Sequence, residues 1–300
     1  MKILLLGGAG QVGTELRRSL APLGELVTTT RDGILHGRAP AVALDLSHIE
    51  SIAPLLARVE PDVVVNATAY TAVDRAESEP EIAFRINADA PGRLAVACAA
   101  GRATLIHLST DYVFDGSGTR PYREDDPTSP LGVYGASKLA GEQAIGASDA
   151  NHLILRTAWV YALHGQNFLR TMLRVGADRD ELRVVADQVG SPTPAWLIAE
   201  AIAAIVAHGV GTPGVRHLVA SGQTSWHGFA EAIFAEAHAQ GLIARVPRVL
   251  PIGTAEYPTP AQRPAWSVLD TRRLQADYAI ELPDWREALR RTLTPSPRGM

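Results

Sequence analysis

A tyrosine and a lysine four residues apart, Tyr134 and Lys138, have the residue types and spacing best suited to proton chemistry in this sequence. The chain has 28 lysines and arginines, but only Lys2 and Lys138 are lysines. Lysine carries a compact ammonium whose proton can be moved, whereas arginine stays protonated. Residues four apart share one face of a helix, and a nearby ammonium lowers the pKa of a phenol. The pair therefore predicts proton exchange with a carbonyl or alcohol, although Tyr-x-x-x-Lys alone is a weak pattern.

A glycine-rich loop near the N-terminus predicts a phosphate-binding turn. The segment 7–13 reads Gly-Gly-Ala-Gly-Gln-Val-Gly and fits both G-x-G-x-x-G and G-x-x-G-x-x-G. It follows the apolar run 3–6, which is typical of a buried strand, and it opens a stretch with helical spacing of apolar residues. Glycines let backbone N–H groups approach a pyrophosphate, and the helix N-terminus adds a partial positive charge. The expected cofactor-binding residues here are Gly7, Gly10, Gln11, Val12 and Gly13.

The end of the second predicted strand bears on the choice of nicotinamide cofactor. An acid at this place usually holds the ribose 2′-hydroxyl of NAD. Here the strand ends in three threonines and Arg31, and Asp32 falls in the following turn. Because Arg31 can pair with a 2′-phosphate, the sequence favours NADPH and leaves NADH open. A solvated loop arginine is the competing interpretation.

Hydroxyl side chains end the strand predicted at 104–108. In a doubly wound sheet the carboxyl ends of the strands face the ligand crevice. Ser109 or Thr110 can therefore reach a substrate carbonyl beside the Tyr134 hydroxyl. Two donors on one oxygen stabilise the charge that develops during hydride transfer.

The elements that must position these residues alternate between strand and helix. Apolar runs at 3–6, 26–27, 42–44, 63–65 and 104–108 are separated by helical stripes at 12–20, 52–59, 83–99 and 133–145. This order predicts an α/β fold: a Rossmann-type doubly wound parallel sheet covered by helices on both faces. After residue 160 short elements, prolines and aromatics predominate, with helices expected at 197–206, 226–238 and 285–293 and a strand at 217–220. We expect a nucleotide-binding domain over 1–160 and a smaller α/β substrate-binding cap mainly over 161–300, with chain crossings between them.

The overall composition excludes several classes of protein. The net charge of −4 gives no basic field for nucleic acid or acidic membranes, and no apolar run reaches the ~20 residues that span a bilayer. The single Cys98 lies in an apolar helical run, so we expect a buried thiol and no internal disulfide. With no signal-peptide pattern at the N-terminus, the expected location is cytoplasmic.

Taken together, these motifs resemble the extended short-chain dehydrogenase/reductase superfamily and, within it, the dTDP-4-dehydrorhamnose reductase family. Seven segments, spread over nearly the whole chain, carry the narrower resemblance. They are Thr-Ala-Val-Asp-x-Ala-Glu-Ser-Glu-Pro (71–80), Ser-Thr-Asp-Tyr-Val-Phe (109–114), Val-Tyr-Gly-x-Ser-Lys-Leu-Ala-Gly-Glu (133–142), Arg-Thr-x-Trp-Val-Tyr (156–161), Asp-Gln-x-Gly-x-Pro-Thr (187–193), His-Leu-Val-Ala-Ser-Gly (217–222) and Tyr-Pro-Thr-Pro-Ala-x-Arg-Pro (257–264).

The resemblance implies roles for individual residues. It implies NADPH-dependent reduction of the 4-keto group of dTDP-4-dehydro-L-rhamnose, the last step of dTDP-rhamnose synthesis. Tyr134 would donate the proton to the 4-keto oxygen, Thr110 would polarise the carbonyl, and Lys138 would hold the nicotinamide ribose and lower the pKa of Tyr134. The sugar pocket would include Tyr112 and Trp159, beside Thr110. The remaining cofactor contacts would be Asp45 and Leu46 near the adenine, and Asn66, Ala67 and Ala69 beside the ribose and pyrophosphate.

Four other functions are weighed against this one. Sugar-nucleotide dehydratases carry Thr-Asp-Glu at the strand end, and here the third residue is Tyr112, so we expect Asp111 to be structural. Sugar-nucleotide epimerases share the Tyr–Lys pair, and another sugar-nucleotide reductase is also open. A regulatory subunit of methionine adenosyltransferase resembles the same family without being catalytic.

Magnesium is not expected. Some members of the family dimerise around Mg²⁺ held by glutamates, one of them in the first helix, where Glu15 stands. The sequence around 194–197 and 293–295 lacks the partner acids, and one carboxylate does not make a site for a cation that takes several oxygen ligands. A homodimer of another kind is left open.

Overall fold

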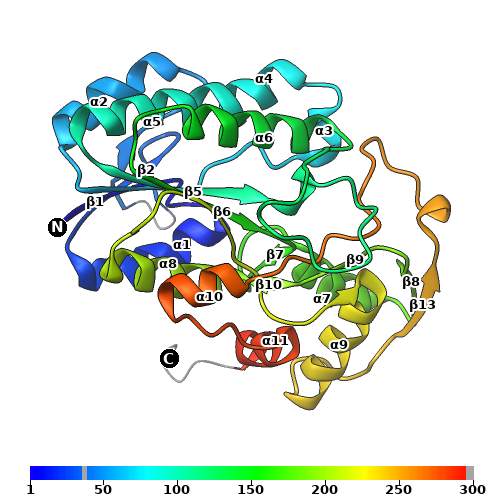
Figure 1. Ribbon diagram of the computed structural model, residues 1–300. Helices are drawn as coiled ribbons and strands as arrows, with labels where there is room; N and C mark the ends of the chain where they lie inside the picture. Colours follow the sequence, from blue (N-terminus) through cyan, green and yellow to red (C-terminus); the bar gives the residue numbers. More distant parts are fainter. Residues whose placement is uncertain (36–38, 295–300) are drawn as a thin grey trace.

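The computed structural model describes residues 1–35 and 39–294, and a seven-stranded parallel sheet forms its centre (Figure 1). The strands lie in the order β11-β6-β5-β4-β1-β2-β3, and every neighbouring pair is parallel. This is the predicted doubly wound arrangement, with the chain starting in the middle of the sheet. The strands are β1 (Lys2–Leu6), β2 (Glu25–Thr30), β3 (Val42–Ala43), β4 (Val63–Asn66), β5 (Thr104–Thr110), β6 (His152–Thr157) and β11 (Gly214–His217).

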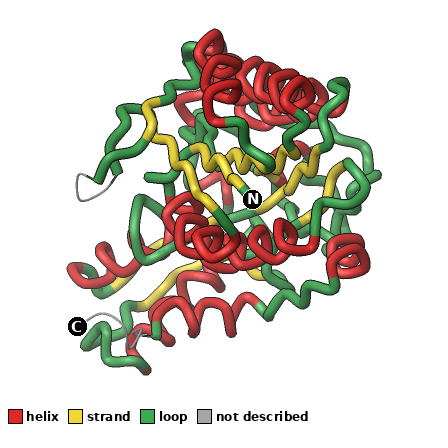
Figure 2. The backbone as a smooth tube through the Cα atoms, turned by 90° about the vertical axis from the view of Figure 1, so that its left-hand side faces the viewer, coloured by secondary structure: helices red, strands yellow, loops and turns green. Residues whose placement is uncertain are grey.

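Helices cover both faces of the sheet (Figures 1 and 2). One face carries α2 (Ile52–Val59), α5 (Ala90–Gly101) and α6 (Val133–Gly146), packed side by side. The other face carries α1 (Gln11–Leu20) and α8 (Ala195–His208), which pack on each other. No helix in the described ranges is long and apolar enough to span a membrane.

Alternation along β1 explains how one short strand serves two cores. Ile3 and Leu5 belong to the apolar cluster beneath α1 and α8, whereas Leu4 and Leu6 belong to the cluster beneath α2 and α5. All four side chains are fully buried. A continuous apolar run is therefore what this central strand requires.

The cap consists of short elements after residue 160, gathered at one end of the sheet (Figure 1). Its helices α7 (Phe168–Asp178) and α9 (Trp226–Ala239) pack together, and α11 (Trp285–Leu293) packs on α9. Strand β11 of the sheet and helix α8 on its face also come from this half of the chain. The sheet and its covering helices therefore include residues after 160. The other elements are α3 (Val73–Ala76), α4 (Pro80–Phe84), β7 (Val160–Tyr161), β8 (Glu181–Val185), β9 (Val189–Gly190), β10 (Thr193–Pro194), β12 (Thr224–Ser225), β13 (Arg248–Ile252) and α10 (Arg272–Tyr278).

Two predicted elements differ from the structure. The helix expected at 83–99 is α4 and α5 joined by a π-helical segment, η4 (Arg85–Asp89), whose wider turn carries the buried Asn87. The strand expected at 217–220 lies earlier: Gly214–His217 pair with Leu153–Arg156. Leu218 to Ala220 are buried beyond the strand end, so their apolar character reflects burial and not pairing.

Two glycines of α6 give a matched test of this packing. A Cβ at Gly141 would lie 2.0 Å from the Asn87 carbonyl oxygen, whereas a Cβ at Gly146 would meet nothing within 4 Å. We expect Gly141→Ala to lower the free energy of unfolding by about 1–3 kcal/mol, because backbone must move. Gly146→Ala should be neutral or stabilising by up to about 1 kcal/mol. Denaturant unfolding measures both, and equal effects would contradict the close contact of α6 with η4.

Candidate functional site

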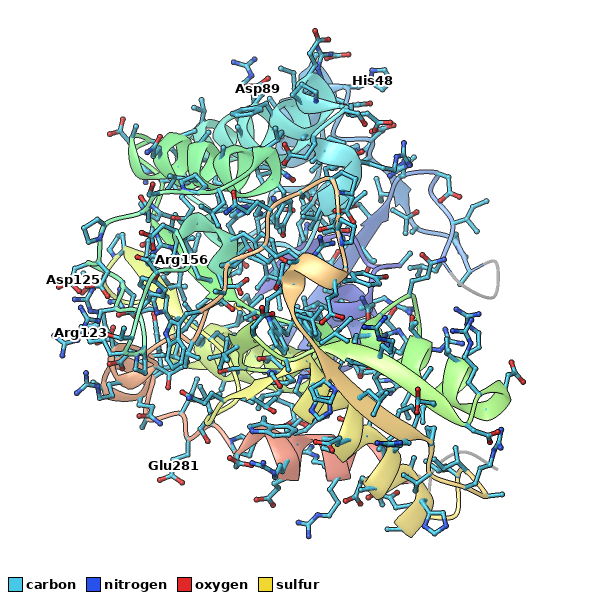
Figure 3. All side chains as sticks on the ribbon, turned by 90° about the vertical axis from the view of Figure 1, so that its right-hand side faces the viewer. His48, Asp89, Arg123, Asp125, Arg156 and Glu281 are labelled. Carbon is cyan, nitrogen blue, oxygen red and sulfur yellow. The ribbon has the colours of Figure 1, made fainter. Side chains whose placement is uncertain are left out.

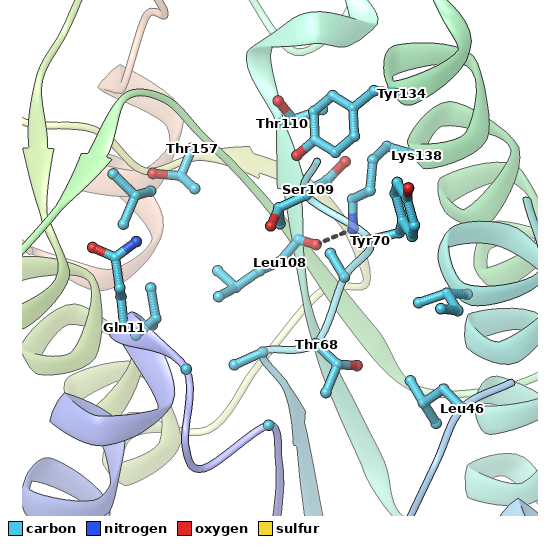
Figure 4. Close-up of a pocket in the computed structure, with 18 of the residues that line it drawn as sticks. Gln11, Leu46, Thr68, Tyr70, Leu108, Ser109, Thr110, Tyr134, Lys138 and Thr157 are labelled. Carbon is cyan, nitrogen blue, oxygen red and sulfur yellow. Dashed lines mark hydrogen bonds between the residues drawn. The ribbon is translucent and has the colours of Figure 1, made fainter. Parts of the chain in front are cut away.

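A crevice of about 600 Å³ lies at the carboxyl ends of the central strands, where a doubly wound sheet binds ligands. Figure 4 shows that its wall combines the glycine loop, the ends of β4 and β5, and helix α6. Of the residues predicted for the site, those that line the crevice are Gly7, Gly10, Gln11, Val12, Arg31, Asp45, Leu46, Ala67, Ala69, Thr110, Tyr112, Tyr134, Lys138 and Trp159.

Two predicted cofactor residues, Gly13 and Asn66, lie behind this wall. Gly13 supports the loop from within, since a Cβ there would lie 2.0 Å from the Gly7 carbonyl oxygen. Asn66 is fully buried at the end of β4 and accepts a hydrogen bond from the backbone N–H of Thr68 at 3.0 Å. Both residues shape the crevice without forming its surface.

The glycine loop has the geometry expected of a phosphate cradle. Gly7 takes a φ of +82°, and the N–H of Gly10 donates to its carbonyl at 2.9 Å, which closes a tight turn before α1. The helix N-terminus then faces the crevice, as a pyrophosphate requires. The Gln11 side chain bonds to Gln166 O and the Asn167 amide, and so ties this loop to the cap segment before α7.

The acid after β2, Asp32, does not line the crevice. Asp32 accepts hydrogen bonds from Thr30 Oγ1 and the Ile34 N–H, both at 3.1 Å, and the latter is the main reason that its pKa is lowered. Arg31 lines the crevice close to Asp45. The charged group that lines the crevice at the end of β2 is therefore an arginine, beside Thr30, as the sequence suggests.

The structure separates Ser109 from Thr110, which the sequence leaves equivalent. Ser109 Oγ donates to Glu142 Oε1 at 2.5 Å, and Glu142 also forms a buried ion pair with Arg156 at 2.6 Å. In Figure 3, Arg156 lies inside the molecule, whereas Arg123, Asp125 and Glu281 lie at its outline. The Ser109 hydroxyl is thus directed to Glu142, whereas the Thr110 hydroxyl, which donates to Asp111 Oδ1 at 3.0 Å, is the one hydrogen-bonded to Tyr134.

The Tyr134 hydroxyl faces that of Thr110 (Figure 4). Loss of solvent raises the pKa of Tyr134 to about 12, while its hydrogen bond with Thr110 acts in the opposite direction. The Tyr112 ring packs edge-on against it, with centroids 5.6 Å apart. Buried Asp111 lies beside Thr110, and burial raises the pKa of Asp111 to about 6.

Lys138 is almost completely buried, with 1% of its surface exposed. Its Nζ donates to the Leu108 carbonyl at 2.6 Å (Figure 4). The same Nζ lies 3.1 Å from His107 Nε2. Burial lowers the pKa of Lys138 to about 8. The predicted lowering of the Tyr134 pKa by Lys138 is not found here: burial of the phenol dominates, and the amine is bonded to β5.

Residues not predicted individually hold α6 in place. Glu77 Oε1 accepts from the Val133 N–H at 2.8 Å at the start of the helix. Asn87, in η4, donates to Ser137 Oγ at 3.0 Å and accepts from the Tyr70 N–H at 2.8 Å, which joins the segment after β4 to α6. Glu77 lies in the segment 71–80, which is one of those that carry the family resemblance. The resemblance implied no role for this residue.

The cap side of the crevice is aromatic. Trp159 has a φ of +48°, a strained value for a residue with a side chain. Its indole stacks on Trp226 of α9 with centroids 3.5 Å apart and planes 4° from parallel. The crevice wall predicted to hold the sugar is therefore fixed to a cap helix.

Glu15 is held by two neighbouring basic side chains. Its carboxylate lies 2.7 Å from His164 Nε2 and 3.6 Å from Arg18 Nη1. Within residues 1–35 and 39–294, no three His, Cys, Asp or Glu side chains are grouped to hold a metal ion.

Comparison with known proteins gives a consistent result. A family model described as the RmlD substrate binding domain matches residues 1–297. A curated dTDP-4-dehydrorhamnose reductase from Burkholderia thailandensis is 48% identical over 298 residues, covering 96% of this chain and 97% of the relative. A dTDP-4-dehydrorhamnose reductase structure from Clostridium acetobutylicum is 34% identical with a TM-score of 0.89, covering 98% of both chains. That of Bacillus anthracis, in complex with NADP, is 33% identical with a TM-score of 0.88, covering 97% of this chain and 98% of the other.

The engagement of Glu15 by His164 leads to a prediction about metals. Addition of EDTA should leave the mass in solution and the melting temperature unchanged, and Mg²⁺ should add nothing, because Glu15 is paired with His164 and belongs to no group of three potential metal ligands among the described residues. Light scattering and thermal unfolding measure these quantities. A mass that falls with EDTA and recovers with Mg²⁺ would show that other carboxylates complete a metal site.

Proposed function

This chain belongs to the family described as the RmlD substrate binding domain, and from that premise we propose that it reduces dTDP-4-dehydro-L-rhamnose to dTDP-L-rhamnose with NADPH. The observation that carries the proposal is the meeting of Thr110, Tyr134 and Lys138 in the crevice that also holds the glycine loop. A carbonyl reduction needs a dinucleotide site beside a proton donor, and residues suited to both roles line this crevice.

The residues of the crevice fit a nicotinamide dinucleotide, which supplies the hydride when bound. The glycine loop and the start of α1 would hold the pyrophosphate, and Arg31 the 2′-phosphate of NADPH. Asp45 and Leu46 would flank the adenine, with Ala67 and Ala69 along the path to the nicotinamide end. Lys138 would hold the ribose next to Tyr134.

Tyr134 is the proposed general acid. With a pKa of about 12 its phenol is protonated at neutral pH, which is the form that donates a proton to the 4-keto oxygen. The Thr110 hydroxyl would donate to the same oxygen and stabilise the charge that develops there. Trp159 and Tyr112 would enclose the sugar. The proposed partner is thus a dTDP-linked 4-keto-6-deoxy sugar, and a cytoplasmic location and a homodimer remain predictions.

Turnover with a matched variant tests the function. Protein mixed with dTDP-4-dehydro-L-rhamnose and NADPH should consume NADPH and yield dTDP-L-rhamnose. Tyr134→Phe keeps the ring but removes the proton, so kcat should fall by about 10²–10⁴-fold while NADPH binding persists. Interconversion of two sugars without net NADPH consumption would indicate an epimerase. Tight binding of methionine adenosyltransferase without turnover would indicate a regulatory subunit.

Arg31 provides a separate test of cofactor preference. Arg31→Ala should raise the KM for NADPH about 10- to 100-fold, because a charge-assisted hydrogen bond contributes about 1.5–3 kcal/mol. The KM for NADH should change little, since NADH lacks the 2′-phosphate. Steady-state kinetics with both cofactors measure the difference, and equal effects would refute the assignment.

A further inference from the structure

A buried chain of hydrogen bonds leads from β4 to the amine of Lys138 and plays no part in the mechanism above. Asn66 Nδ2 lies 3.0 Å from His107 Nδ1, and His107 Nε2 lies 3.1 Å from Lys138 Nζ. Asn66 and His107 are almost completely buried, with exposures of 0% for both. The polar atoms of these side chains therefore find their hydrogen-bond partners within the protein.

The direction of each hydrogen bond follows from the first donor in the chain. The Thr68 N–H can only donate, so the Asn66 atom facing it at 3.0 Å is the oxygen Oδ1. Asn66 Nδ2 then donates to His107 Nδ1, which must accept. A neutral imidazole that accepts at Nδ1 carries its proton on Nε2. His107 thus presents a donor, and not an acceptor, to Lys138.

We propose that His107 is a positioning residue for Lys138: held by Asn66 as the Nε2–H tautomer, it donates to Nζ and favours the neutral amine over the ammonium. An ammonium has only donors and cannot receive this hydrogen bond, whereas a neutral amine has one lone pair that can. The Leu108 carbonyl, at 2.6 Å, accepts one of the N–H groups in either form. The inference rests on the proposed function for its catalytic meaning, but its chemistry can be tested without substrate.

The charges around Lys138 do not prevent a shift toward the neutral amine. The ionisable groups come from each element packed around the amine: Tyr134 and Glu142 from α6, His107 from β5, Asp111 from the turn after β5, Tyr70 from the segment after β4, and Arg156 from β6. Glu142 favours the ammonium, but its carboxylate is paired with Arg156 at 2.6 Å. Burial lowers the pKa of both Lys138 and His107. This direction favours the neutral imidazole and the neutral amine that the proposed hydrogen bonds need.

The consequence for the reaction is a lysine that gives up its proton easily. After Tyr134 has donated its proton, the phenolate must be protonated again. An ammonium whose pKa is about 8 transfers a proton downhill to a phenolate whose conjugate acid has a pKa of about 12. His107 would make Lys138 a better proton source for Tyr134, and the Leu108 carbonyl would hold the amine in place in both forms.

The scarcity of lysine makes the amine directly observable. In protein labelled with [¹³Cε]lysine, NMR should show two lysine signals, with the half-buried Lys2, whose Nζ donates to the Val59 carbonyl, as internal reference. In His107→Gln the new side chain can turn its amide oxygen to Nζ, so the titration midpoint of Lys138 should rise by about one pH unit or more. The alkaline loss of kcat, which follows deprotonation of Lys138, should move to higher pH with it. His152→Gln, which changes a buried histidine of β6 bonded to the Ala150 carbonyl, is the matched control and should move neither.

The tautomer of His107 provides a second measurement. It does not need the His107→Gln variant and can be used even if that variant folds poorly. ¹⁵N shifts of the histidine rings should show His107 protonated on Nε2 alone. In Asn66→Asp one carboxylate oxygen can still accept from Thr68 while the other accepts from His107 Nδ1–H, so the proton should move to Nδ1. An Nδ1–H tautomer in the wild type, or an unchanged Lys138 midpoint in folded His107→Gln, would overturn the inference. Absence of turnover with normal NMR behaviour would instead reject the proposed function alone.

Discussion

The buried ion pair of Glu142 and Arg156 is the interaction on which the site depends. It joins α6 to β6, and through Ser109 it reaches the end of β5, so one carboxylate fixes the helix that bears Tyr134 and Lys138 on the two strands beneath it. Both side chains are about 5% exposed. A pair buried this deeply contributes little net stability by itself, but loss of one partner leaves an uncompensated charge. The register of α6 on the sheet is therefore strongly specified.

The surroundings of this pair keep a neighbouring histidine uncharged. His217 packs edge-on against Phe114, and the Arg156 guanidinium lies over the face of the same ring. Burial lowers the pKa of His217 to about 3, and the Arg156 charge acts in the same direction, so the imidazole is neutral. A second cation beside Arg156 would compete for Glu142, and a neutral histidine avoids that competition.

Much of this architecture could be predicted from the sequence, because local patterns determine it. The run at 3–6 and the glycines after it specify a central strand and its turn, and the confirmed parallel sheet follows from the alternation of elements. The residue pattern alone could not distinguish Ser109 from Thr110, although the family resemblance favoured Thr110, since the role of Ser109 depends on a glutamate 33 residues away. It also could not reveal that Lys138 bonds to β5 and not to Tyr134, because the spacing of four residues describes one helix and not its neighbours.

The stacked indoles of Trp159 and Trp226 have a consequence for selectivity. Trp159 lines the crevice in a strained backbone conformation, and its main stacking partner belongs to α9, a helix of the cap. Structural units of a protein open with different free energies, and a side chain held by a neighbouring unit shares the fluctuations of that unit. Discrimination between ligands at this wall is thus linked to the local stability of α9. Evolution can alter what the crevice accepts by changing the core beneath α9, without replacing any residue that a ligand touches.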